Sequence, residues 1–398
     1  MGKKKLDLNL NKIENSIDQG IHWLINSGIQ NKKGSRSGSV NAWFDTKRKK
    51  YSFIYSEING YFITMMVFLY KKTNDKKYIK YALNSASWLI KNALHKNGGF
   101  KCLFLIDKTS LHAYKKNQIY SFDNGVILNG FVSLYKVTKK KFLLQKAIKC
   151  ADWLTDYCID NNNGVKPVYE ISENKFYESD KEWSTISGSY HTKVATGLVN
   201  LYSVTKKRKY LEFAKRICER SLKFQNKSGR FISFPFKGGT NAHPHCYSAE
   251  GLWSVGKYLK NKRYLLASKK ATKWILKEQN IKGQIPRLYL VDKIIYNERV
   301  DAIAQVIRLL FLNSDFQSIL KSDVKIKIQK LLKILLKYQN KNHKNIKVEG
   351  SFNWGKTSQG KLLKHPNSWV TFFSIQSLIL LKNFLKNEKS TFDSFDLV

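Results

Sequence analysis

The sequence predicts an all-α fold in which six helical hairpins close into a ring, an (α/α)6 toroid. Two observations support this prediction. Two kinds of helical segment alternate along the whole chain, and the connections between them alternate between short turns and long loops. Each hairpin of such a ring buries its apolar face only against its neighbours, so a chain of 398 residues can form one closed domain.

The first kind of segment carries apolar residues at positions i, i+3, i+4 and i+7, with lysines between them. This spacing is typical of a helix that has one face in solvent. The copies begin at Ile17, where the pattern is weaker, and at Tyr78, Phe142, Tyr210, Tyr264 and Val324. We predict that these six segments form the outer helices of the ring.

The second kind of segment is more apolar and has small residues on one face. Its copies begin at Gly60, Asn124, His191, Ser248, Asp301 and Ser368. Within them, Gly130, Gly197, Gly251 and Ala304 allow close backbone approach where helices crowd around a central axis. We predict that these six segments form the inner helices.

The composition favours a single domain over residues 1–398, with a helical core over about residues 13–384 and short polar tails. Hydrophobic residues make up 42% of the chain, which is enough for a large core, and no linker-like tract interrupts it. The five cysteines form no CxxC pair and are expected to be buried thiols. We expect a cytoplasmic protein without a membrane span, because neither a signal-peptide pattern nor a long uninterrupted apolar run occurs.

The charge is strongly basic, with 71 Lys and Arg residues against 29 Asp and Glu residues and a net charge of +42. Part of this excess is a solvated lysine surface. The rest steers anions toward any cleft. The basic residues are scattered and no helix-turn-helix, zinc-finger or RNP pattern occurs, so nucleic acid is an unlikely partner. An acidic glycan would be attracted by the same field.

The alternation of connections places the functional site at one mouth of the ring. Short turns lead from each inner segment to the next outer one, whereas long connections such as 96–120, 158–189 and 280–297 lead into the inner segments. Long loops carry function more often than tight turns. Four of the eight histidines fall at these entries, which helix capping does not require.

A metal site and a cofactor are not predicted. His243 and His245 form a His-Pro-His pair, but no third ligand is tied to them by spacing and no HExxH motif occurs.

Several motifs resemble those of the six-hairpin family of carbohydrate-active toroids, and more narrowly those of prokaryotic toroid proteins associated with surface-polysaccharide biosynthesis. The motifs are SEINGY at 56–61, SFDNG at 121–125, HPHCYSAEGL at 243–252, GSFNWG at 350–355 and HPNSWVTFF at 365–373. The resemblance covers about residues 13–384 and implies the toroid fold. It leaves hydrolase, lyase and epimerase activities open.

Ser189-Tyr190-His191-Thr192 is similar to the Tyr-His-Thr motif of glucuronyl C5-epimerases. Removal of the C5 proton of a uronate requires a base, an acid that returns the proton, and a group that neutralises the carboxylate. Our leading hypothesis is therefore an epimerase or lyase that acts on an acidic, uronate-containing glycan. The proton-transfer candidates are Tyr190, His191, His245 and Tyr247, and the carboxylate-binding candidates are Arg287 and Arg299. The other substrate-binding candidates are Tyr120, Asn124, His243, Asp301, His365 and Asn367, with Trp183 and Trp369 for sugar stacking.

Two alternatives remain open. Asp123 stands in an Asp-x-Gly setting that matches one catalytic acid of the unsaturated-glucuronyl hydrolases, whereas Tyr190-His191 occupies the position of their second acid. Glu57 or Glu298 would then have to complete the pair of carboxylates that glycoside hydrolysis needs. The other alternative is a glycan-binding protein without catalytic activity.

Overall fold

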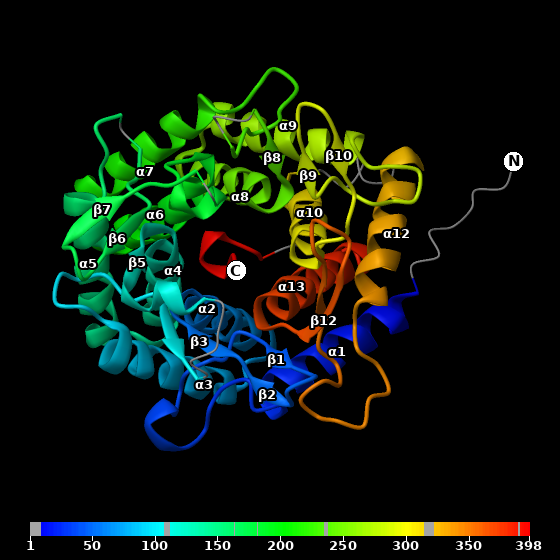
Figure 1. Ribbon diagram of the computed structural model, residues 1–398, viewed down its shortest axis with the longest axis horizontal. Coiled ribbons are helices and arrows are strands. Elements are labelled where there is room, and N and C mark those ends of the chain that lie inside the picture. Colours follow the sequence, from blue (N-terminus) through cyan, green and yellow to red (C-terminus); the bar gives the residue numbers. More distant parts are fainter. Residues whose placement is uncertain are drawn as a thin grey trace, which may run out of the picture.

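The computed structural model describes residues 9–106, 112–162, 164–180, 182–234, 238–313, 322–388 and 391–398. Within them, twelve α-helices alternate between an inner and an outer ring around one axis (Figure 1). Figure 1 also shows α1 and α12 side by side, so the first and last outer helices close the ring. The predicted all-α toroid is confirmed.

The outer helices are amphipathic because lysines alternate with the apolar stripe that faces inward. They are α1 (Leu10–Asn26), α3 (Lys76–Trp88), α5 (Lys141–Tyr157), α7 (Arg208–Leu222), α9 (Lys262–Lys277) and α12 (Ser322–Lys337). The π-helical turn η2 (Leu89–Ala93) extends α3. Each outer helix lies where the sequence predicted it.

The inner helices are buried on almost all sides, because they contact both the outer ring and one another. They are α2 (Ser56–Thr73), α4 (Ser121–Thr138), α6 (Thr192–Thr205), α8 (Ala242–Leu259), α10 (Val300–Asn313) and α13 (Ser368–Leu385). By length and composition α13 is apolar enough to cross a membrane, but 78% of it is buried inside the protein, as in the core helix of a globular fold.

Glycines allow the inner helices to approach one another closely. A Cβ atom built on Gly251 of α8 would lie 2.1 Å from the carbonyl carbon of Thr192 on α6. Between α6 and α4, a Cβ on Gly197 would lie 2.7 Å from the carbonyl oxygen of Gly125. Between α4 and α2, a Cβ on Gly130 would lie 2.7 Å from the carbonyl oxygen of Gly60. Real Cβ contacts are longer than this, so the ring depends on small residues at these positions.

Replacing Gly251 with Ala is therefore expected to destabilise the protein by about 1–3 kcal/mol, because a rigid backbone carbonyl occupies the space of the new methyl group. Helix propensity alone would act in the opposite direction and stabilise α8 by about 1 kcal/mol. Urea unfolding followed by circular dichroism measures the difference. A midpoint that is unchanged or higher in the variant would contradict the close approach of α6 and α8.

The short turns that follow four of the inner helices share one conformation. The helices α2, α4, α6 and α8 end at a left-handed residue that is not glycine, namely Asn74, Lys139, Lys206 or Lys260, with φ between 54° and 60°. The first three of these donate their backbone N–H to the carbonyl oxygen four residues earlier. The repeated cap ends each inner helix at an equivalent point, so the turns form one mouth of the ring.

The long connections at the opposite mouth contain short antiparallel strands, which the sequence did not predict. The sheets pair β1 (Phe44–Asp45) with β2 (Lys50–Tyr51), β3 (Phe53–Tyr55) with β4 (Leu103–Leu105), and β11 (Asn353–Lys356) with β12 (Leu362–Pro366). Two further sheets have the orders β5 (Gln118–Tyr120), β6 (Val168–Glu170), β7 (Lys175–Tyr177) and β8 (Thr240–Asn241), β9 (Leu288–Tyr289), β10 (Ile294–Ile295). Because β3 and β5 run directly into α2 and α4, they fix the first turns of these two helices.

The C-terminal segment fills the centre of the ring near the short-turn mouth (Figure 1). Ser133 of α4 donates a hydrogen bond to the carbonyl oxygen of Phe395 at 2.8 Å, and Gln376 of α13 donates one to that of Asp396 at 2.7 Å. Lys193 of α6 donates to the carbonyl oxygen of Val398 at 2.9 Å. Inner helices from different hairpins therefore hold this segment in place.

Candidate active site

A cavity of about 360 Å³ lies at the long-connection mouth, where the inner helices begin. Its lining side chains are Tyr55, Glu57, Ile58, His112, Lys115, Tyr120, Phe122, Asp123, Glu182, Trp183, Ser184, His243, Tyr247, Arg299, Trp354 and Trp369. They come from the first turns of α2, α4, α8 and α13 and from the connections between hairpins. Apolar and aromatic side chains with a few convergent ionisable groups are typical of a small-molecule site.

Three carboxylic acids line this cavity; Glu182 pairs with Lys115, and the other two lie in the first turns of inner helices. Glu57 is the second residue of α2 and Asp123 is the third residue of the neighbouring helix α4. Burial raises the pKa of Glu57 well above its ordinary value, and the adjacent charge of Asp123 raises it further. Burial also raises the pKa of Asp123, to about 7. Two carboxyl groups in one buried site do not both ionise easily at neutral pH.

The surroundings of Asp123 favour its ionised form over that of Glu57. Burial is the largest influence on the pKa of Asp123, but the nearby ammonium group of Lys115 and hydrogen bonds from Cys102 and Tyr55 oppose it. The Tyr55 hydroxyl lies 3.4 Å from Asp123 Oδ1. The second oxygen, Oδ2, is buried without a hydrogen-bond partner among the described residues. Of the two acids, Asp123 is therefore the one that ionises at the lower pH.

A second group of polar side chains lies around His243. Its Nδ1 lies 2.7 Å from Gln305 Oε1, which can only accept a hydrogen bond, so Nδ1 carries the proton and Nε2 keeps a free lone pair. Burial lowers the pKa of His243 to about 3, and the charge of Arg299 contributes to the decrease, so the imidazole is neutral. Burial alone would raise the pKa of Asp301, but Arg299 and His243 lower it to about 2.

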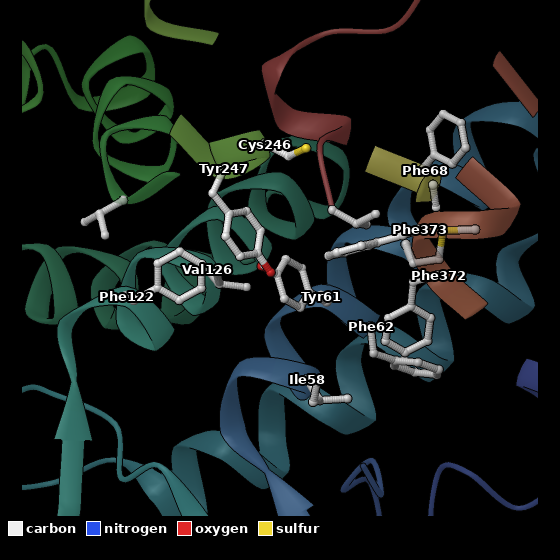
Figure 2. Packing of buried hydrophobic residues seen from close by; sticks show 14 of the residues in the cluster. Ile58, Tyr61, Phe62, Phe68, Phe122, Val126, Cys246, Tyr247, Phe372 and Phe373 are labelled. Carbon is white, nitrogen blue, oxygen red and sulfur yellow. The ribbon is translucent and has the colours of Figure 1, made fainter. Parts of the chain in front are cut away.

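Aromatic side chains form much of the cavity lining, and two of them, Phe122 and Tyr247, belong to the buried packing that Figure 2 draws. The rings of Phe122 and Tyr247 have centroids 4.8 Å apart, and the hydroxyl groups of Tyr247 and Tyr61 meet at 2.9 Å. Figure 2 shows these two tyrosines pointing toward one another, with Phe373 beside Tyr61. Trp183, Trp354 and Trp369 lie around the rest of the cavity. Partly exposed tryptophan rings of this kind suit the apolar faces of sugar rings.

The two cations of the cavity are already paired. Lys115 Nζ lies 3.5 Å from Glu182 Oε2, and Arg299 donates to both oxygens of Asp301 at 2.8 to 3.1 Å. The cavity therefore does not share the strong positive charge of the chain as a whole.

Solved structures share this architecture over nearly the whole chain. A sugar epimerase from a ruminal bacterium superposes with a TM-score of 0.77 at 9% identity, covering 96% of this chain and all of that one. Cellobiose 2-epimerase from Bacillus thermoamylovorans gives 0.74 at 11% identity over 93% and 98% of the two chains. An unsaturated glucuronyl hydrolase from a Bacillus species gives 0.65 at 13% identity over 92% and 96%. The chain therefore has the (α/α)6 toroid fold of these structures.

Sequence comparisons match smaller parts of the toroid. Residues 110–248 match the model of glycosyl hydrolase family 76, a segment that includes Asp123 and the first turn of α8. An uncharacterized protein of Caenorhabditis elegans is 30% identical over 112 residues, which are 27% of this chain and 15% of that protein.

The toroid brings about half of the sequence-predicted site residues together in the cavity. These are Glu57, Tyr120, Asp123, Trp183, His243, Tyr247, Arg299 and Trp369. Tyr120 donates its hydroxyl proton to Gln118, and Trp369 donates its indole N–H to Asp301 at 3.2 Å.

Three of the four proton-transfer candidates do not line the cavity, contrary to our expectation. The Tyr190 hydroxyl donates to the carbonyl oxygens of Ser184 and Ile186. The ring of His191 contacts Ser121 Oγ at 3.2 Å, and burial lowers its pKa to about 3. His245 lies between the backbone N–H of Phe231 and the carbonyl oxygen of Ala271, so it joins α8 to α9. These contacts give the three side chains structural roles.

The remaining candidates also lie outside the cavity lining. Asn124 hydrogen-bonds to both backbone groups of Phe100, and Asn367 caps α13. Arg287 donates to the carbonyl oxygen of Lys356, and Glu298 pairs with the Lys356 ammonium at 2.7 Å. Asp301 is fully buried and pairs with Arg299. The ring centroid of His365 lies 6.0 Å from that of Trp43. Of the two carboxylates considered as partners for Asp123, only Glu57 is in the cavity.

Several lining residues were not assigned from the sequence. Tyr55 precedes α2, and His112, Lys115, Glu182 and Trp354 lie in the long connections. No helical spacing connects the loop residues to the inner helices, so only the folded chain brings them to the cavity. In the described part of the chain, no three His, Cys, Asp or Glu side chains gather closely enough to hold a metal ion.

Proposed function

We propose that this toroid is a glycoside hydrolase in which Glu57 and Asp123 act on either side of the scissile bond. The observation that carries the proposal is the pair itself: buried Asp123 and half-buried Glu57 line one cavity, and their surroundings raise both pKa values to different extents. Glycoside hydrolysis uses two carboxyl groups whose environments separate their pKa values in this way. The match of residues 110–248 to a glycoside hydrolase family supports the same reading.

The proposed reaction follows from the protonation states. Glu57 donates its proton to the glycosidic oxygen as the bond from that oxygen to the anomeric carbon breaks. Asp123 stabilises the positive charge that develops on the sugar and directs water, or its own carboxylate oxygen, to the anomeric carbon. We assign this step to Oδ2 of Asp123, which is buried and has no hydrogen-bond partner among the described residues.

We infer that the substrate is a neutral glycan rather than the acidic one that the net charge suggested. Lys115 and Arg299 are the cations of the cavity, and both are paired with carboxylates. A uronate would have to displace Glu182 or Asp301 to reach them, at the expense of an existing ion pair. The three tryptophans offer stacking surfaces that need no charge on the sugar.

The test is reducing-sugar release from a panel of neutral oligosaccharides, including manno-oligosaccharides, beside uronate-containing ones. We expect release from a neutral substrate without an ultraviolet-absorbing unsaturated product. Turnover of uronate polymers alone, or accumulation of an unsaturated product, would contradict the proposal. Binding of glycans with no turnover across the whole panel would favour a non-catalytic protein.

The pH dependence supplies an independent prediction. Because Asp123 must be ionised, kcat/KM is expected to fall as the pH drops through the pKa of Asp123, about 7. Replacing Tyr55 with Phe removes a hydrogen bond that lowers this pKa, so the acidic limb of the profile should move to higher pH. Tyr120→Phe is the matched control, because that hydroxyl donates to Gln118 instead. If the acidic limb of the pH profile moved in neither variant, or equally in both, the Tyr55 hydroxyl would not lower the pKa of Asp123.

A second candidate function rests on His243. Its neutral imidazole has Nδ1 directed to Gln305, which leaves Nε2 as a base within the same cavity. This arrangement suits abstraction of a proton next to a carbonyl group, as an epimerase or isomerase requires. In this second candidate function the base is His243, whereas the sequence hypothesis named His191 and His245.

Deuterium incorporation separates the two functions. A sugar epimerase would exchange a carbon-bound proton of its substrate with solvent deuterium, and His243→Gln would abolish the exchange. Hydrolysis places no deuterium on carbon, so bond cleavage without exchange would exclude the second candidate.

A further inference from the structure

The short-turn mouth carries a concentration of positive charge that the proposed reaction does not use. The turn segments 71–77, 136–141, 206–209 and 257–263 each contain four Lys or Arg residues. All of these basic residues are exposed. We call them together the basic face. At the opposite mouth the charge is mixed: the loop over 158–189 contains six carboxylates and three lysines, whereas the connection over 32–50 contains seven basic residues and one carboxylate.

Most of this charge is not neutralised within the protein. In these turns, Lys71, Lys77, Lys136, Lys209 and Arg263 form ion pairs with described carboxylates. The other basic side chains of the four turns have no ion pair with a described residue. Unpaired like charges in such proximity repel one another, and an anionic partner would relieve that repulsion.

The arrangement of the turns favours a flat partner. Because α2, α4, α6 and α8 end in the same left-handed cap, their turns lie at equivalent positions around one mouth of the ring (Figure 1). A flat anionic surface can meet all four turns at once. A rod such as duplex DNA would meet only some of the turns. Proteins that bind duplex DNA commonly present a basic groove, or a stripe of basic residues along one helix.

A small apolar pocket on the same face points to lipid. A cavity of about 240 Å³ lies next to the turn between α8 and α9, with Trp253, Leu265, Leu266 and Leu312 as apolar lining and Lys257 and Lys269 beside them. The side chain of Leu266 is 52% exposed, and Phe142 and Tyr258 near the turns are 39% and 37% exposed. Apolar groups beside lysines are the usual composition of a surface that rests in the interface of a bilayer.

We propose that the basic face docks this protein on a membrane surface that carries anionic lipid headgroups. The lysines contact the headgroups, and Leu266 with its apolar pocket takes part of an acyl chain. The active-site mouth then faces away from the membrane, toward the aqueous phase. Each Lys or Arg near an anionic bilayer strengthens binding by about fivefold, so the four turns together suffice for stable attachment at moderate salt.

The test is co-sedimentation of the full chain with vesicles of phosphatidylcholine, with and without phosphatidylglycerol. The test variant carries Lys140→Glu, Lys141→Glu, Lys207→Glu and Arg208→Glu. These positions flank or begin α5 and α7, where acidic side chains favour a helix N-terminus and the fold should persist. The control variant carries Lys32→Glu, Lys33→Glu, Lys47→Glu and Lys361→Glu, which reverse the same number of exposed lysines at the opposite mouth.

We expect the wild type and the control variant to bind the phosphatidylglycerol vesicles but not pure phosphatidylcholine. The test variant should bind at least about 100-fold more weakly. Equal loss in both variants would show that net charge alone is responsible and would overturn the proposal. So would binding of duplex DNA without binding of vesicles. Glycan hydrolysis in solution should be the same in the test variant and the wild type, so failure here is distinct from failure of the proposed reaction.

Discussion

Replacing Asp123 with Asn is expected to lower kcat/KM for hydrolysis by between about 100-fold and 10,000-fold. The amide keeps the shape of the side chain but cannot carry the negative charge that stabilises the reacting sugar. Glu57→Gln should cause a loss of similar size with natural substrates, because the amide has no acidic proton to donate. Initial rates of reducing-sugar release at neutral pH measure both effects.

Two comparisons make this prediction specific. Glu298→Gln is the matched control, because that carboxylate lies at the same mouth but outside the cavity lining and pairs with Lys356. It should retain nearly full activity. With a nitrophenyl glycoside, whose leaving group needs no protonation, Glu57→Gln should recover much of its rate while Asp123→Asn should not. Equal recovery in both variants would contradict the division of roles between the two acids.

The second large effect is expected at Glu250, which is fully buried between two cations. Its carboxylate contacts the Lys193 ammonium at 3.0 Å and the guanidinium of Arg308. Lys193 also holds the C-terminal segment through Val398, and Arg308 reaches Gln376 at 2.8 Å. The group thus links α6, α8, α10 and α13 below the cavity. Its removal would leave two uncompensated positive charges in the centre of the ring.

Glu250→Gln is accordingly expected to lower the free energy of unfolding by about 3–5 kcal/mol. Thermal or urea unfolding followed by circular dichroism gives the value. Glu212→Gln is the control, since Glu212 forms an exposed pair with Lys215 on α7 and surface pairs contribute little. If the two variants unfolded at the same midpoint, the buried group would not be a major source of stability.

The outer helices were predictable because each buries one apolar stripe with a period near 3.6 residues, and the inner helices because their long apolar segments carry small residues on one face. The short strands were not, since each spans only two to five residues and no periodicity can develop over that length. They still matter for the site: β3 and β5 lead into the turns that carry Glu57 and Asp123. The glycines of the inner helices were predicted correctly, because close approach of helices restricts the residue types that fit.

The cavity lies at the mouth where the sequence placed the site, but only some of the predicted residues line it. All side chains at a helix entry look equivalent in sequence, although successive residues point about 100° apart. His243 and Tyr247, four residues apart on α8, share the face toward the cavity, whereas His245 points outward to Ala271 of α9. Spacing within each first turn would have separated these roles. Lys115 and Glu182 belong to loops, where no comparable rule applies.

The central claim is that the pKa values of Glu57 and Asp123 are both raised and differ from one another, and a carboxyl titration tests it without knowledge of the substrate. Carbon-13 chemical shifts of the two side-chain carboxyl groups, assigned with Glu57→Gln and Asp123→Asn, are followed against pH in the wild type. We predict that Asp123 titrates with a pKa of about 7 and Glu57 with a higher one. Titration of both groups near their ordinary values of 3.8 and 4.5 would contradict the claim.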